Sequence, residues 1–301
     1  MTRGSWTRRD FLMRTATAGA AVLAGGTVLS ACTSTGAGAG GSVLAGAKSA
    51  GTIKIGIAGE EPYGFTDLTG KVTGEAPEVA RAVLRAVGIK DVTAQQVDFG
   101  SLIPGLNAKQ FDMVCAGMNI TPERCKQAAF SIPDYTALTA FLVRTGNPTG
   151  VATFEDVASK NLKLAVLGAA VEQGYATDAG VPAGNITTFP DQNALLQAVT
   201  AGRVDAAALT DISLKWLAGK NPQAGVTVTA GFTPKAKGKD VVSAGGFVFR
   251  TADADLKAAF DTELGNLQKS GKWAEIAKPF GFSESNLPPA GLTTQQLCTA
   301  T

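Results

Sequence analysis

The first part of the chain alternates between strand-like and helix-like hydrophobic patterns. Apolar and polar residues alternate over residues 52–57 (TIKIGI), which predicts a β-strand. Apolar residues then recur at helical spacing over 75–87, and Gly88 follows as a helix stop signal. Residues 121–124 (TPER) open another helix, with threonine as N-cap and proline in the first position. The same reasoning predicts strands at 92–99, 111–116 and 136–143, and a short helix at 101–110.

The pattern breaks at residues 146–150 (GNPTG), and a second alternating block follows. Residues 235–240 are expected to form a charged loop. A returning strand at 244–250 and a helix at 253–270 complete the chain. Within the second block the pattern predicts strands at 164–167, 186–189 and 204–208, and helices at 171–179 and 193–201.

This alternation of strands and helices is typical of α/β proteins. The break and the later return predict two lobes, the first comprising 52–144 plus 246–301 and the second 148–242. Two crossings of the chain would form a hinge. A cleft between two lobes is a common place for a small ligand, so we expect the binding site there.

Residues 1–31 have the pattern of an export signal. Residues 7–12 (TRRDFL) resemble the twin-arginine motif, and an apolar stretch of small residues follows. Residues 29–32 (LSAC) resemble the bacterial lipoprotein box, in which the cysteine becomes lipidated. We therefore predict a twin-arginine lipoprotein signal peptide over 1–31 and a lipid anchor at Cys32. The alternative is an ordinary secretory signal with a chance cysteine.

Residues 32–51 are rich in Gly, Ala, Ser and Thr, which predicts a flexible tether. Residues 36–41 (GAGAGG) match the G-x-G-x-x-G pattern formally. We reject them as a dinucleotide site, because no strand is predicted before them and no helix after them.

Composition narrows the possible chemistry. The 301 residues include no histidine, which removes His-dependent zinc sites, Ser-His and Cys-His nucleophile pairs, and haem held by histidine. The formal net charge is +2, but the first 31 residues hold four of the 27 basic residues and one of the 25 acidic ones. The rest carries a net charge of −1, so no electrostatic footprint for nucleic acid remains. We predict neither a metal nor a cofactor.

Three cysteines remain beyond Cys32, and an exported protein can form disulfides. Cys115 lies in an apolar, strand-like run and is expected to be a buried thiol. We predict a disulfide between Cys125 and Cys298.

Several longer motifs carry a resemblance to a known family. Residues 121–124 (TPER) and 130–135 (FSIPDY), in an exported α/β protein, resemble the polar amino-acid type of substrate-binding proteins of ABC importers. The resemblance covers essentially the whole mature chain. It implies a two-lobed type II periplasmic-binding-protein (Venus-flytrap) fold with two hinge crossings. Four stretches are similar to the ectoine- and hydroxyectoine-binding branch in particular: 74–81 (GEAPEVAR), 99–106 (FGSLIPGL), 120–127 (ITPERCKQ) and 278–282 (KPFGF).

The resemblance assigns a central ligand-binding role to Arg124. A guanidinium group can hold a carboxylate through two charge-assisted hydrogen bonds. In the ectoine-type branch, aromatic faces and an acidic residue hold the cationic ring. Tyr63 and Phe99 match the aromatic positions, and Glu60 would supply the countercharge. The family motif further implies that Gly117 and Thr121 line the site. Taken alone, Phe99 fits ordinary packing as well as it fits a ligand contact.

Two positions depart from the branch. Asn119 stands where a third aromatic residue is usual, and residues 169–172 (AAVE) replace Gly-Thr-Val-Glu. Ala170 therefore lacks a ligand-binding hydroxyl, although it and Val171 still provide N–H groups. On the second lobe, amino-acid binders of the family use an aspartate for the α-amino group. The expected position is Thr210, with Asp211 beside it; Thr210 also fits a simple helix cap.

The leading interpretation is a monomeric, exported solute-binding lipoprotein, not an enzyme. It would deliver a small zwitterion to a membrane permease powered by a separate ATPase subunit. The ligand would be ectoine-like or a polar amino acid. An enzyme on the same fold, such as a cyclohexadienyl dehydratase, is the second interpretation, with Glu60, Glu172 or Asp211 as candidate acid/base. A ligand-sensing extracellular domain is the third.

Overall fold

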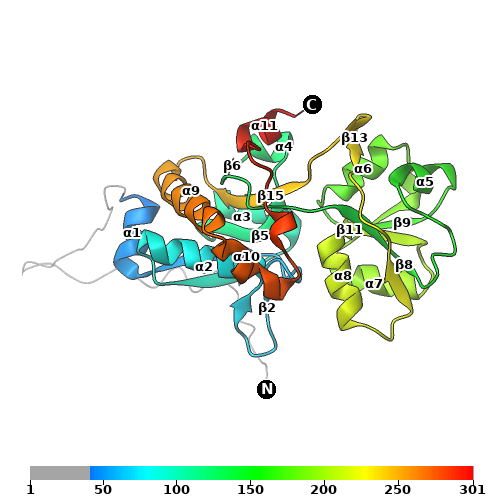
Figure 1. Ribbon diagram of the computed structural model, residues 1–301, viewed down its shortest axis with the longest axis horizontal. Helices are drawn as coiled ribbons and strands as arrows, with labels where there is room; N and C mark the ends of the chain where they lie inside the picture. The colour runs from blue at the N-terminus through cyan, green and yellow to red at the C-terminus, as the bar shows by residue number, and fades with distance from the viewer. Residues whose placement is uncertain (1–40, 301) are drawn as a thin grey trace, which may run out of the picture. The chain divides into compact units, whose positions relative to one another are not determined.

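The computed structural model describes residues 41–300, coloured along the chain in Figure 1. The predicted signal peptide, the lipidation of Cys32 and the first part of the predicted tether lie outside these residues. The described chain contains two principal β-sheets, each with its own helices.

The first sheet has the strand order β4-β1-β5-β15-β6, and β7 also pairs with β15. Strands β1, β4 and β5 are parallel, whereas β15 runs antiparallel to β5. The parallel strands therefore end at one edge of the sheet. The bounds are β1 Thr52–Ile57, β4 Asp91–Gln96, β5 Met113–Asn119, β6 Ala129–Phe130, β7 Tyr135–Thr136 and β15 Ala244–Phe249.

Helices cover both faces of this sheet. On one face α2, α9 and α10 pack together, and their buried residues form one apolar cluster with β1 (Figure 1). A second cluster lies around α3 and the C-terminal helix α11. The bounds are α2 Glu75–Val87, α3 Leu102–Asn107, α4 Pro122–Cys125, α9 Ala254–Lys269, α10 Lys272–Ala277 and α11 Thr294–Thr299.

Part of the predicted tether is a helix. Residues Val43–Ala50 form α1, with Ser42 as N-cap and Gly51 in the left-handed conformation at the C-terminal end. Ala47 is buried, and Val43 and Leu44 pack against the core of the first sheet. The prediction of a flexible tether is therefore wrong for residues 43–50, because tertiary packing stabilises a helix that its small-residue composition did not suggest.

The second sheet has the order β10-β9-β11-β8-β12. Strands β9, β10 and β11 are parallel, and β8 runs antiparallel to both β11 and β12. The strands are β8 Thr139–Arg144, β9 Leu164–Leu167, β10 Ile186–Phe189, β11 Ala206–Thr210 and β12 Val226–Val228. The helices are α5 Phe154–Ser159, α6 Glu172–Asp178, α7 Gln192–Thr200 and α8 Asp211–Lys220.

The chain passes between the sheets at residues 137–138 and again at 241–243 (Figure 1). The prediction that the first lobe extends to residue 144 is wrong, because β8 hydrogen-bonds to β11 and β12 of the second sheet. The glycine-rich break at 146–150 is a turn within the second lobe. Two short hairpins complete the fold: β2 Phe65–Thr66 with β3 Val72–Thr73, and β13 Lys235–Ala236 with β14 Lys239–Asp240. The second of these forms where we expected only a charged loop.

Cys125 and Cys298 form a disulfide with a Cα–Cα distance of 5.7 Å, and it joins α4 to α11. This is the pair predicted from the sequence. Cys115 is a free, fully buried cysteine on β5, also as predicted.

Candidate functional site

The predicted binding residues come from segments that follow the carboxyl ends of parallel strands in both sheets. In α/β proteins, ligands bind in the crevice beyond these strand ends. A cavity lies at this place, with residues from both lobes in its wall. Its lining residues are Glu60, Tyr63, Phe99, Gly117, Asn119, Arg124, Ala170, Val171, Glu172, Leu209 and Thr210.

Arg124 lies on the single turn of α4, whose N-cap Thr121 accepts a hydrogen bond from the Arg124 backbone N–H (3.3 Å). Its guanidinium donates to the carbonyl of Asn119 on the first lobe (2.8 Å) and to that of Ala169 on the second (2.9 Å). Burial lowers the pKa of Arg124, and the Glu172 carboxylate opposes this shift. Because a guanidinium has five N–H groups, three remain for a ligand.

Aromatic rings form one side of the cavity. The Arg124 guanidinium lies over the Phe99 ring, 5.2 Å from its centroid, which is cation–π geometry. Tyr63 is almost fully buried beside Tyr135, with ring centroids 5.1 Å apart, and its hydroxyl donates to Thr210 Oγ1 across the cavity (3.1 Å). Tyr63 is therefore both a core residue and a wall of the site.

Two carboxyl groups face the cavity. Burial raises the pKa of Glu60 to about 7, although a hydrogen bond from Ser213 Oγ (2.6 Å) acts in the opposite direction. Burial also raises the pKa of Glu172 to about 7, and the nearby Glu60 contributes to this increase. With pKa values near 7, the two groups together hold about one proton at neutral pH. The site therefore contains the positively charged guanidinium of Arg124 and two carboxyl groups that change their protonation state near neutral pH.

The cavity measures about 20 Å³, roughly enough for one water molecule. A solute of amino-acid size therefore requires the two lobes, or the lining side chains, to separate. Within the cavity, separation would break three single hydrogen bonds between the lobes: Tyr63 to Thr210, Ser213 to Glu60, and Arg124 to the Ala169 carbonyl.

The structure brings together most of the predicted site residues. Glu60, Tyr63, Phe99, Gly117, Asn119, Arg124, Ala170, Val171 and Thr210 all line the cavity. Thr121 acts as the cap of α4 and is not part of the lining. The side-chain amide of Asn119 donates to Ser243 Oγ (2.5 Å), and Thr210 also caps α8 through Ser213 N–H.

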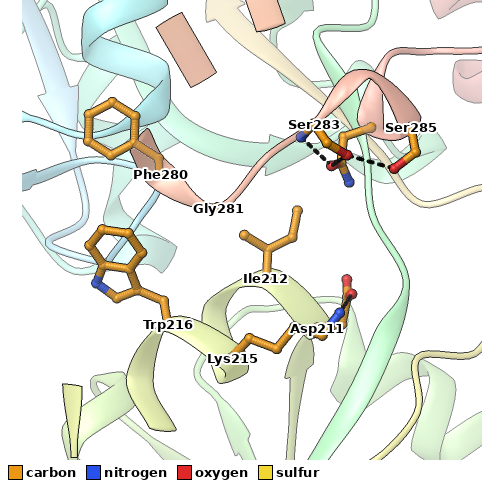
Figure 2. A pocket seen from close by; sticks show the side chains of 9 residues that line it. Asp211, Ile212, Lys215, Trp216, Phe280, Gly281, Ser283 and Ser285 are labelled. Atoms are coloured by element: carbon orange, nitrogen blue, oxygen red, sulfur yellow. Dashed lines mark hydrogen bonds and ion pairs between the residues drawn. The ribbon is translucent and has the colours of Figure 1, made fainter. Parts of the chain in front are cut away.

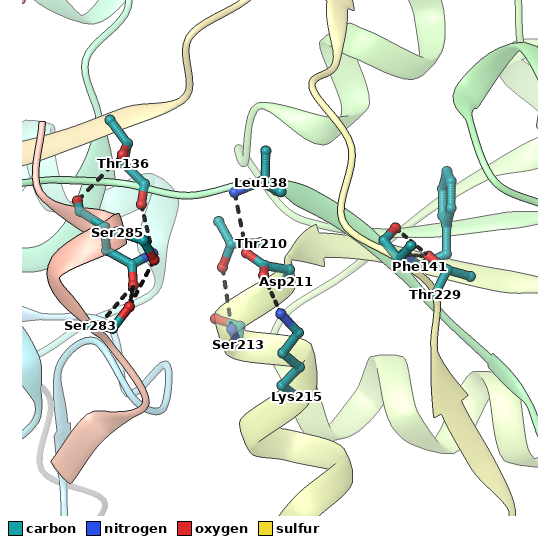
Figure 3. Close-up of polar contacts among 12 residues, drawn as sticks. Thr136, Leu138, Phe141, Thr210, Asp211, Ser213, Lys215, Thr229, Ser283 and Ser285 are labelled. Carbon is teal, nitrogen blue, oxygen red and sulfur yellow. Dashed lines mark hydrogen bonds and ion pairs between the residues drawn. The ribbon is translucent and has the colours of Figure 1, made fainter. Parts of the chain in front are cut away.

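Asp211, which was also predicted to bind the ligand, does not line this cavity. Its carboxylate accepts from the Leu138 N–H (3.2 Å) and from Lys215 Nζ (2.5 Å), as Figure 3 shows. Asp211 instead lines a second cavity of about 360 Å³ between α8 and residues 280–286 (Figure 2). Asp211 therefore fastens the start of α8 to a crossing strand.

We place the functional site in the smaller cavity because of its chemistry. The polar groups of the larger cavity bind one another: Asp211 pairs with Lys215, and Ser283 and Ser285 share a hydrogen bond (2.8 Å; Figures 2 and 3). The smaller cavity instead presents a guanidinium with unused N–H groups and two carboxyl groups with raised pKa values.

Two lining residues were not predicted as ligand contacts. Glu172 was predicted only as a possible acid or base of an enzyme, although it lies in the 169–172 segment that departs from the ectoine-binding branch. The sequence contained one signal for such a contact: Glu172 is a charged residue directly after a predicted strand-to-helix turn. Leu209 is an apolar strand residue, and nothing in its sequence context separates it from the core.

Among residues 41–300, no group of three or more His, Cys, Asp or Glu side chains is arranged to hold a metal ion. Within the same residues, no helix has both the length and the apolar character needed to cross a membrane.

Two α/β lobes joined by two crossings, with a polar cavity at their facing strand ends, define a two-lobed solute-binding protein with the type II periplasmic-binding fold. Residues 53–283 match the family of bacterial extracellular solute-binding proteins, family 3, and the chain belongs to that family.

Known relatives agree with this assignment. The chain is 37% identical over 255 residues to a probable amino-acid ABC transporter periplasmic-binding protein of Sinorhizobium fredii, covering 83% of this chain and 84% of the relative. It is 27% identical over 244 residues to the lysine/arginine/ornithine-binding periplasmic protein of Escherichia coli K12, covering 76% and 87%. The crystal structure of EhuB in complex with hydroxyectoine superposes with a TM-score of 0.77 at 35% identity, covering 86% of this chain and 98% of that one. The chain is thus an extracytoplasmic solute-binding protein of an amino-acid-type ABC importer.

Proposed function

We propose that the protein captures a small zwitterion of the ectoine or hydroxyectoine type and delivers it, as a monomer, to an ABC permease with its ATPase subunit. Arg124 holds the carboxylate of the solute. Glu60 faces the positive end, and the rings of Tyr63 and Phe99 lie against the delocalised cation.

The observation that supports this proposal best is the distribution of charge in the cavity. Arg124 keeps three N–H groups for an anion, while Glu60 and Glu172 approach the same small space. A solute with one negative and one positive end matches this distribution, and an anion or an uncharged sugar does not. The likeness to the hydroxyectoine complex of EhuB points to the same class.

A basic amino acid is a second candidate, because the site holds two acids and the similar Escherichia coli protein is a lysine/arginine/ornithine-binding protein. The two candidates differ in net charge. A neutral zwitterion is balanced by Arg124 and one ionised glutamate, so little proton release is expected. A ligand of net charge +1 needs both glutamates ionised, so its binding at pH 7 should release about one proton.

Isothermal titration calorimetry with ectoine, hydroxyectoine, L-arginine, L-lysine and L-glutamine tests the proposal. Titrations in two buffers with different ionisation enthalpies measure the released protons. We expect ectoine or hydroxyectoine to bind with a stoichiometry of one and with little proton release. Binding of arginine alone, with release of about one proton, would assign the site to basic amino acids.

Arg124→Ala should reduce the affinity for any of these ligands by at least roughly 100-fold, because a charge-assisted bidentate contact is lost. Arg203→Ala is the matched control, since Arg203 is an exposed arginine in the turn after α7, away from the cavity. Unchanged affinity in Arg124→Ala would contradict the proposed carboxylate site.

An enzyme on this fold remains the competing function, because two carboxyl groups with pKa values near 7 suit acid/base chemistry. Incubation with a prephenate-type acid, followed by chromatography, distinguishes the two. Turnover would favour a dehydratase, whereas stoichiometric binding of the zwitterion without turnover favours transport.

We further propose that the protein is exported through the twin-arginine route and is lipid-anchored at Cys32 outside the cytoplasmic membrane. Labelling of cells with a radioactive fatty acid should mark the wild-type protein. A Cys32→Ala variant should remain unlabelled, and equal labelling of both proteins would exclude this anchor.

A further inference from the structure

We propose that the Cys125–Cys298 disulfide positions Arg124 for ligand binding, in addition to stapling the C-terminal helix. Cys125 directly follows Arg124 on α4, and the bond joins this turn to α11 (Figure 1). The inference rests on the proposed role of Arg124 as the carboxylate-binding group.

Besides the disulfide, two hydrogen bonds connect the segment that carries Arg124 to its surroundings within the first lobe: Arg124 donates to the Asn119 carbonyl (2.8 Å), and Asn107 Nδ2 donates to the Gln127 carbonyl (3.1 Å). Helix α4 is four residues long and contains no buried residue. An isolated helix of that length is unstable, because one turn fixes several backbone dihedrals for very few hydrogen bonds. The Thr121 cap, at 3.3 Å, and the exposed Gln127 Nε2 contact with the Glu123 carbonyl, at 3.2 Å, are local to the same segment. Neither of them fastens the turn to the rest of the lobe.

Helix α11, in contrast, is well fixed. Thr293 and Gln296 form a capping box at its start, and Thr294 Oγ1 donates to the carbonyl of the buried Ser131 (2.6 Å). Leu297, next to Cys298, is buried in the apolar cluster around α3 and β5. The disulfide therefore ties the turn that carries Arg124 to this packed cluster and restricts the motion of the turn.

A pre-positioned guanidinium loses less conformational entropy when it binds a carboxylate. Removal of the bond should therefore weaken ligand binding as well as protein stability. A disulfide that only stapled the C-terminus would lower stability and leave the affinity of the folded protein unchanged.

The test compares the double variant Cys125→Ser/Cys298→Ser with Leu264→Ala. Leu264 is fully buried on α9 in the other cluster of the first lobe, so its truncation lowers stability without touching α4. Calorimetry with hydroxyectoine and with L-arginine, well below both melting temperatures, measures the affinity. We expect the double serine variant to bind roughly three- to tenfold more weakly and Leu264→Ala to bind within twofold of wild type.

A double-mutant cycle separates positioning from a general loss of structure. In an Arg124→Lys background, removal of the disulfide should change the affinity less than twofold, because the positioned group is already gone. An equal loss in both backgrounds, or unchanged affinity in the double serine variant, would overturn the inference.

If the wild type binds neither probe, the proposed function fails, and amide hydrogen exchange then tests the structural part of the inference, that the disulfide holds the turn of Arg124 in place. Faster exchange at residues 123–126 than at the Thr153-capped helix α5, on removal of the disulfide, supports it. Unchanged exchange at α4 refutes it.

Discussion

At the level of single residues, Gly117 shows how closely the site is built. Its φ of +58° lies in the left-handed region, and a Cβ placed there would be 2.2 Å from Cδ1 of Tyr63. Tyr135 Oη also donates to the Gly117 carbonyl (2.7 Å), so this backbone contacts two aromatic residues of the site. Glycine is required here because the Tyr63 ring occupies the space of a side chain.

Gly117→Ala should therefore displace Tyr63 and weaken binding of the zwitterion by about tenfold, as one wall of the cavity moves. Gly174→Ala on α6 is the control, because nothing lies within 4 Å of its added Cβ. That change should leave affinity unaltered and raise stability by about 0.5 kcal/mol. Calorimetry and thermal melting measure both effects; equal affinities for the two variants would show that the Tyr63 position is unimportant.

Glu75 is a second unusual residue, located beneath the site at the start of α2. It is fully buried, and within residues 41–300 no group other than the neighbouring Asp134 carboxyl offers its carboxyl oxygens a hydrogen bond. Burial raises the pKa of Glu75 well above its usual range, and the nearby Asp134 carboxyl raises it further. Burial likewise raises the pKa of Asp134 to about 6, against the effects of hydrogen bonds from the Glu75 carboxyl and from Trp273 Nε1 (2.8 Å).

Groups whose pKa is raised by folding hold their protons more tightly in the native state than in the unfolded state. Their contribution to stability is complete below pH 4 and is lost as the pH rises through 6 and above. Glu75→Met should remove this loss and increase the free energy of unfolding at pH 8 by roughly 1–3 kcal/mol. Urea denaturation at pH 5 and pH 8 measures the difference.

Glu78 on the same helix is the control of opposite sign. Burial alone would raise its pKa, but Lys71 and Arg81 hold the pKa of Glu78 below its ordinary value. The ionised Glu78 carboxylate contributes to the free energy of unfolding at neutral pH, and this contribution is lost on acidification. Glu78→Met should therefore lower the free energy of unfolding at pH 8. If both variants shift the pH dependence in the same direction, the buried-acid interpretation of Glu75 is wrong.

At the level of elements, α4 can be tested through its cap. Thr121→Val removes the side-chain acceptor for the Arg124 N–H and should cost about 1 kcal/mol of stability. Thr153→Val removes the equivalent cap of α5, which lies in the second lobe away from the cavity. We expect similar losses of stability in denaturant titrations, but weaker zwitterion binding in calorimetry only for Thr121→Val. A Thr121→Ser variant should restore both, and failure of this rescue would argue against the cap.

The sequence predicted elements with local hydrophobic patterns better than elements that depend on tertiary packing. The bounds of β1, α2, β9 and β10 agree with the structure, because their hydrophobic periods and stop signals are local. Helix α1 was missed, because its small residues become helical only against the core. The lobe boundary was misplaced at the glycine-rich break, whereas the chain crosses at 137–138, where no composition signal exists.

The residues of the candidate site show the same difference between local signals and dependence on the tertiary structure. Arg124 and Tyr63 were found through motif residues in fixed local positions. Asp211 was predicted to lie in the site beside Thr210, but the two adjacent residues line different cavities at the first turn of α8. Side-chain direction at a strand-to-helix junction depends on backbone angles that spacing alone does not determine. The position of Glu172 in the wall of the candidate cavity was missed for the same reason.

At the level of the whole molecule, Glu61 connects the lobes outside the binding cavity. Its carboxylate accepts from Trp216 Nε1 (2.7 Å) and from Lys220 Nζ (2.6 and 2.9 Å), both on α8 of the second lobe. The Gln192 amide, oriented to satisfy both its groups, donates to the Glu61 carbonyl (2.9 Å) and accepts from its N–H (3.1 Å). Glu60, in contrast, faces the binding cavity, so of these two neighbouring glutamates only Glu61 connects the lobes outside the cavity.

These contacts exist only when the lobes are close together, so they favour the closed form without touching the ligand. The variant Trp216→Phe/Lys220→Met removes both donors to the Glu61 carboxylate and retains most of the apolar bulk. The exposed ion pair is worth at most about 1 kcal/mol, and the bond from the Trp216 indole adds about 1–2 kcal/mol. The closed form should lose part of this sum, and the bound zwitterion should dissociate roughly tenfold faster.

Stopped-flow measurement of the dissociation rate tests this prediction, and small-angle scattering reports whether the ligand-free lobes separate further. Lys215→Met is the matched control, because Lys215 pairs with Asp211 on its own helix and not across the lobes. Its dissociation rate should remain within twofold of wild type. If the double variant behaves like this control, the Glu61 contacts do not affect closure, and the contacts inside the cavity alone must hold the lobes around the solute.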